Sequence, residues 1–125
     1  APQEGFGAMG DWLDKNEDAA HAFVHADLRA RLWLFDPKNK SKAYKIMRDY
    51  GYDVPPEFEA MYQTEINQIA KDGGWADSKT MDDFVKSLQA TGALPKDIRW
   101  QDYVELKYLW AAQKALGLPN RPAYI

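Results

Sequence analysis

Apolar side chains recur every three or four residues along most of this chain, the spacing of helices that bury one face. The longest such stretch runs from Glu17 to Phe35. Asn16 precedes it as an N-cap residue type, and acidic residues in the first turn suit the positive end of a helix dipole. Asp36-Pro37 ends the stretch. We predict a long helix over 17–35, preceded by a short helical turn at 11–15.

Four shorter helical stretches follow. Pro55-Pro56 leads into one of them, and Thr80 to Asp83 resembles a capping box before another. Glycines that suit helix ends follow the stretches. No alternating pattern typical of strands occurs. The sequence therefore predicts a mostly α fold, a single helical domain over residues 1–125 with about five helices plus a short N-terminal turn. The four shorter helices are expected at 41–50, 58–69, 81–88 and 103–116, with Gly51, Gly73-Gly74, Gly92 and Gly117 behind them.

Charge and composition exclude several classes of function. The chain has 16 basic and 19 acidic residues, and its densest basic group, Lys38 to Lys45, is flanked by acids. Binding of nucleic acid or of an anionic membrane needs a concentrated basic face, so we predict neither partner. No apolar run approaches the ~20 residues of a membrane helix. The absence of cysteine excludes disulfides and thiolate sites, and residues 1–4 show no signal-peptide pattern.

His21 and His25 are spaced to lie on one helix face, near Asp18. A stable metal site wants three or four ligands, and no HExxH motif or further histidine is present. We therefore interpret them as solvated histidines and predict no metal and no cofactor. There is also no nucleophile–base arrangement, phosphate-binding glycine loop or dinucleotide motif, and the paired acids lie in first helical turns, so we predict that the chain is not an enzyme.

Asp27 and Arg31 lie inside the apolar arc of the long helix and are four residues apart. A charged pair on a buried face needs further hydrogen bonds to offset its desolvation. The favoured interpretation is a satisfied ion pair at a junction between helices or lobes. The alternative is a role in contacting a ligand.

Trp33 faces the other side of the same helix, near Ala22, Ala26 and Ala30. A helix that is apolar on two sides is normally sandwiched between layers or contacts a partner. Trp75 follows two glycines in a loop, and Trp100 precedes the last helix. Loop aromatics either stack on ligands or cover a core.

Three blocks of the sequence carry a resemblance to a known family. They are residues 12–24 with the later Asp36-Pro37, then Gly73-Gly74-Trp75 with 81–88 and 91–96, and finally residues 100–109. In this order they resemble the C-terminal part of periplasmic solute-binding proteins of the nitrate/sulfonate/taurine ABC importer family. Glu17 stands where the family commonly has proline.

The resemblance implies non-catalytic capture of a small organic or anionic solute by lobe closure, an exported or periplasmic location, and delivery to an ABC permease. A complete member has two α/β lobes, and this chain is too short to supply either sheet. It is therefore expected to be a fragment or truncated form, or to associate with a second polypeptide or with itself. The alternative is a free-standing helical interaction module. The candidate ligand-binding residues are Asp27, Arg31, Trp33 and Trp75.

Overall fold

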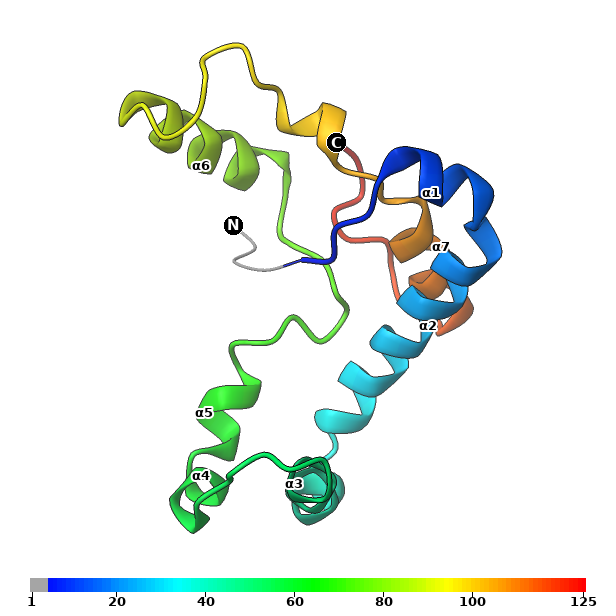
Figure 1. Ribbon diagram of the computed structural model, residues 1–125, viewed down its shortest axis with the longest axis vertical. Helices are drawn as coiled ribbons and strands as arrows, with labels where there is room; N and C mark the ends of the chain where they lie inside the picture. Colours follow the sequence, from blue (N-terminus) through cyan, green and yellow to red (C-terminus); the bar gives the residue numbers. More distant parts are fainter. Residues whose placement is uncertain (1–4) are drawn as a thin grey trace.

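The computed structural model describes residues 5–125, and within that range every regular element is helical. Figure 1 shows the helices joined by extended loops, and this confirms the predicted mostly α fold class. Seven α-helices and two short 3₁₀ segments lie in the described range. They are α1 (Gly10–Lys15), α2 (Glu17–Leu34), η1 (Pro37–Asn39), α3 (Lys40–Asp49), α4 (Pro56–Ala60), α5 (Tyr62–Ile66), α6 (Ser78–Ala90), η2 (Trp100–Tyr103) and α7 (Lys107–Ala115).

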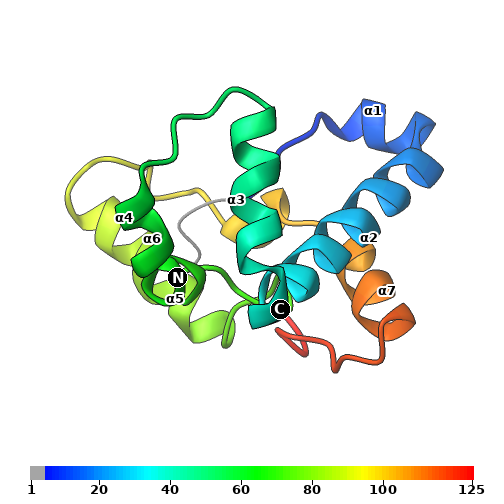
Figure 2. The same ribbon diagram turned by 90° about the horizontal axis from the view of Figure 1, so that it is seen from below.

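The core is built on the pair of helices α2 and α7, which lie side by side in Figures 1 and 2. Leu28 of α2 is only 1% exposed, and Ala112 of α7 is also buried. The predicted periodicity of residues 17–35 is confirmed, because α2 ends at Leu34 with Phe35 as its C-cap. An ion pair at 2.5 Å between Glu17 Oε1 and Lys107 Nζ joins the first turns of the two helices.

Helices α3 to α6 extend away from this pair, whereas α1 lies beside it (Figure 1). On one side, the hydroxyl of Tyr44 in α3 donates to the carbonyl of Phe58 in α4 at 2.5 Å, and the hydroxyl of Tyr62 in α5 donates to the carbonyl of Leu34. On the other side, the indole Nε1 of Trp100 donates to Asp82 in α6 at 2.7 Å. Polar contacts of aromatic side chains thus help to hold the outer helices, together with a few buried apolar residues such as Ile66 and Val85.

The predicted helix over 58–69 is wrong as a single element. It is broken at Met61 into α4 and α5, and the chain after Ile66 forms turns. Its apolar face met a packing surface at one end only, since Ile66 is buried while Phe58 and Met61 remain 43% and 45% exposed. Contacts from α3 and from the end of α2 fix the two halves separately instead.

Two predicted helix starts and one predicted cap also differ. The last helix begins at Lys107 rather than Tyr103, because buried Trp100 holds η2 against α6 before the chain returns to α2. Helix α6 begins at Ser78 with Asp77 as its cap, which accepts the Thr80 N–H at 2.8 Å, so the predicted capping box is wrong. Asn16 makes no side-chain cap; its amide donates to the carbonyl of Trp12. The predicted glycine ends of α3, α6 and α7 are confirmed by positive φ angles at Gly51, Gly92 and Gly117.

Candidate functional site

Asp27 and Arg31 form the ion pair that their spacing predicts. Arg31 Nε lies 2.7 Å from Asp27 Oδ2, and Arg31 Nη1 donates to the carbonyl of Ala70 at 3.1 Å. The two side chains are 26% and 28% exposed. The pair therefore ties α2 to the turn after α5, as in the satisfied junction pair expected from the sequence. A ligand-contacting role for these residues stays a prediction.

Trp33 lies on the opposite, exposed side of α2. It lines an open groove of about 400 Å³ with Ala26, Arg29 and Ala30 of α2 and with Ile46 of α3. Trp33 is 36% and Ile46 is 49% exposed, so this apolar surface is in contact with solvent. The structure thus separates Trp33 from the Asp27–Arg31 pair by the width of the helix.

Trp75 and Trp100 pack against each other with their rings at 76° and their centroids 6.4 Å apart. Trp100 is buried and is hydrogen-bonded to Asp82, so it covers the core and is not free to stack on a ligand. Trp75 is half-buried. Its Nε1 is buried and has no hydrogen-bond acceptor among the described residues, which is uncommon for an indole N–H.

His21 lies with its ring edge toward the ring of Tyr108, at a centroid distance of 4.7 Å. It therefore packs in the α2–α7 interface, and the predicted solvated role does not fit it. In residues 5–125 no group of three or more acidic or histidine side chains is placed to hold a metal ion. Within the same residues, no helix has the length and hydropathy needed to cross a membrane.

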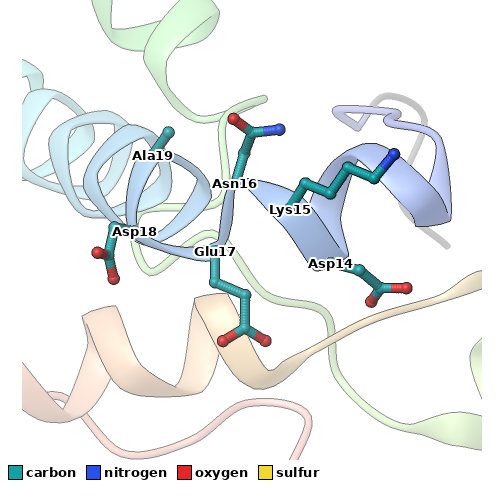
Figure 3. A pocket seen from close by; sticks show the side chains of 6 residues that line it. All are labelled: Asp14, Lys15, Asn16, Glu17, Asp18 and Ala19. Carbon is teal, nitrogen blue, oxygen red and sulfur yellow. The ribbon is translucent and has the colours of Figure 1, made fainter.

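A second groove, of about 470 Å³, lies at the junction of α1 and α2 (Figure 3). The side chains of Asp14 and Glu17 lie on one side of this junction, and those of Lys15 and Asn16 on the other. The Lys107 ammonium donates to Glu17 and lowers the pKa of that carboxyl. With Asp18 added, three carboxylates and one lysine line the groove, so it suits a cationic group better than an anion.

The densest polar cluster was not singled out by sequence reasoning. Arg121 donates from Nε and Nη2 to the two carboxylate oxygens of Asp72, each at 2.6 Å. Gln113 is fully buried on α7 and donates to the carbonyls of Asp72 and Arg121, while its own oxygen accepts the Arg121 N–H. These bonds clamp the C-terminal tail to the loop before α6. One signal in the sequence could have indicated this cluster: polar Gln113 lies four residues after Leu109 and therefore on the apolar face of the last helix.

This clamp gives the fold a predicted dependence on pH. The hydrogen bonds from Arg121 hold the pKa of Asp72 below its ordinary value. A carboxyl whose pKa is lower in the folded state stabilises the fold above its unfolded pKa, about 3.9, and this contribution is lost as the pH falls through the folded pKa. We expect the free energy of unfolding, measured in urea, to drop between pH 5 and pH 3 by less in Asp72→Asn than in the unsubstituted chain. An equal drop in the two would contradict this role.

Comparison with known proteins shows which class of protein this chain resembles and gives one particular relative. The chain is distantly similar to a solute-binding protein, which confirms the resemblance noted in the sequence. This relative is the nitrate/nitrite binding protein NrtA of Nostoc sp. (strain PCC 7120 / SAG 25.82 / UTEX 2576), which is 30% identical over 140 aligned positions. The alignment covers 95% of this chain and 32% of the relative, so the chain spans about a third of that protein's length. No protein-family model and no solved structure matches the chain.

Proposed function

We propose that this chain is the helical, C-terminal part of a solute-binding component of an ABC-type importer and takes part in capturing a small anionic solute without changing it chemically. The observation that carries the proposal is the similarity to a nitrate/nitrite binding protein along 95% of the chain. The order of the matching blocks, from Trp12 to Leu109, supports the same assignment. An exported location and delivery of the solute to a permease belong to the same proposal.

Within this function, the chain contributes a stable helical scaffold. The α2–α7 pair is buried, and the Asp72–Arg121 clamp fixes the tail beside it. Among the four predicted ligand residues, Arg31 carries the positive charge that an oxyanion prefers. Asp27 already neutralises this charge. An anion would therefore bind at Arg31 only through guanidinium donors that Asp27 and the Ala70 carbonyl leave available.

The proposal is tested by a chimera in which this chain replaces the matching third of the Nostoc relative. We expect the chimera to unfold cooperatively and to bind nitrate with a dissociation constant within about tenfold of the relative's own, by isothermal titration calorimetry. The control is the relative with that third deleted, which should not bind. A chimera that folds cooperatively without binding nitrate, or that fails to fold, would count against the assignment.

A second candidate is a free-standing helical interaction module, favoured by one observation, the solvent-exposed groove around Trp33. Large aromatic side chains at the centre of an interface commonly contribute most to its affinity. We expect Trp33→Ala to weaken binding of a protein partner at least tenfold. Tyr103→Ala, at another site that is 74% exposed, is the matched control. Unchanged binding by the Trp33 variant would exclude this candidate.

A further inference from the structure

Helix α2 carries a complete apolar stripe that nothing in the described chain covers. Its five members lie on the side away from buried Leu28, and all are exposed. Along the helix they are separated by three, four, four and three residues, which keeps them on one face. At its C-terminal end the stripe continues into Ile46 of α3, across the groove already described. The stripe consists of Ala19, Ala22, Ala26, Ala30 and Trp33.

The total surface of the molecule is larger than that of a compact monomer of its size. The chain has an accessible surface of 9133 Å². A folded monomer of 14.3 kDa is expected to expose about 6,800 Å². The excess is therefore roughly 2,300 Å², whereas a stable interface buries about 800 Å² on each partner. The chain has enough spare surface for a dimer interface.

We propose that two copies of this chain associate through α2, antiparallel and related by a two-fold axis that passes beside Ala26. The spacing of the stripe reads the same from either end, with Ala26 at its centre. An antiparallel copy therefore presents its stripe in register: Ala22 meets Ala30 of the partner subunit, and Trp33 meets the partner's Ala19. Small residues along the seam let the two helices approach closely, and each large Trp33 is matched with a small residue.

The charges at the two ends of α2 fit the antiparallel arrangement. The groove at its N-terminal end is lined by Asp14, Glu17 and Asp18, whereas the groove at its C-terminal end contains Arg29. Arg29 is in none of the ion pairs of the described residues. Antiparallel pairing brings the acidic end of one helix toward the basic end of the other, and it also opposes the two helix dipoles. A parallel pair would place like charges side by side.

The first test is the mass of the purified chain, read by native mass spectrometry and sedimentation velocity. We expect a dimer of twice 14.3 kDa. Ala26→Glu places two carboxylates beside the axis and should weaken the dimer at least tenfold, giving a monomer at the same concentration. Glutamate is nearly as good a helix former as alanine, so circular dichroism should be unchanged. The matched control is Ala111→Glu at an exposed position of α7, which should remain dimeric.

The second test uses the absence of cysteine from the chain. Under mild oxidation, Ala26→Cys should cross-link with itself rapidly, because the axis brings the two copies of that position together. Ala22→Cys and Ala30→Cys should cross-link faster when mixed than either does alone.

Three outcomes would overturn the proposal. One is a monomeric unsubstituted chain, even if it binds a different polypeptide. Another is a dimer that Ala26→Glu does not weaken. The third is cross-linking of Ala22→Cys with itself as fast as with Ala30→Cys, which would indicate a parallel pair.

Discussion

Leu28→Ala is expected to lower the free energy of unfolding by about 3–4 kcal/mol, since truncating a buried leucine removes its transfer free energy and leaves a cavity. Leu28 is 1% exposed in the α2–α7 pair. A Cβ added at Gly73 would lie 3.7 Å from one of the Leu28 methyl groups, so the loop before α6 passes close to Leu28 as well. Many large apolar side chains elsewhere in the chain are exposed, so the α2–α7 pair provides a large part of the buried core. Urea unfolding followed by tryptophan fluorescence measures the effect.

The matched control for this substitution is Leu13→Ala. Leu13 is half-buried on the short helix α1, outside the α2–α7 pair. Leu13→Ala should lower the free energy of unfolding much less than Leu28→Ala does under the same conditions. A loss below about 1 kcal/mol for Leu28→Ala would mean that α2 and α7 do not form the stabilising core, because that is the effect of an ordinary, mostly exposed site.

Gly74→Ala is expected to release the C-terminal tail and to lower the free energy of unfolding by about 2–3 kcal/mol, the upper part of the range for overfilling a packed site. A Cβ atom at this position would lie 1.9 Å from the carbonyl oxygen of Arg121. That oxygen is backbone, so the loop or the tail must move. The movement would break the bond from Gln113 to this carbonyl and disturb the Asp72–Arg121 ion pair.

Hydrogen exchange measures this release at the backbone N–H of Arg121, which Gln113 accepts in the intact clamp. We expect its protection to fall in Gly74→Ala while that of α2 is largely retained. Gly10→Ala is the control, because no atom lies within 4 Å of a Cβ added there. Unchanged protection of Arg121 in Gly74→Ala would show that the tail does not depend on the close approach.

Local patterns predicted the helices well where each pattern also met a partner surface. The stretch from Glu17 to Phe35 became α2 because both its periodicity and its packing against α7 point to a helix. The stretch over 58–69 had an equally regular pattern, yet it broke at Met61, where Phe58 and Met61 stay exposed and Ile66 beyond the break is buried. Periodicity reports which residues could share a face, and it does not report whether anything lies opposite that face.

In the candidate site, too, contacts within one helix could be predicted from the sequence, and contacts between distant segments could not. The pairing of Asp27 with Arg31 and the place of Trp33 on the opposite side of the helix followed from helix geometry alone, because both concern residues within one or two turns of the same helix. The bond of Arg31 to Ala70 and the bonds of Gln113 and Arg121 to Asp72 join residues 39 to 49 positions apart. No local pattern encodes which distant groups meet.

The sequence by itself determined the helical class, the long amphipathic α2 with two apolar sides, the glycine ends of three helices and the resemblance to solute-binding proteins. The helical features depend on side-chain spacing and backbone preference, which act over a few residues, whereas the resemblance rests on the three matching blocks of residues. The tertiary structure decided where helices broke and began, which side of α2 was buried, and how the tail was fastened to the loop at Gly74. Those outcomes depend on contacts between distant segments, whose energies are set only when the chain is folded.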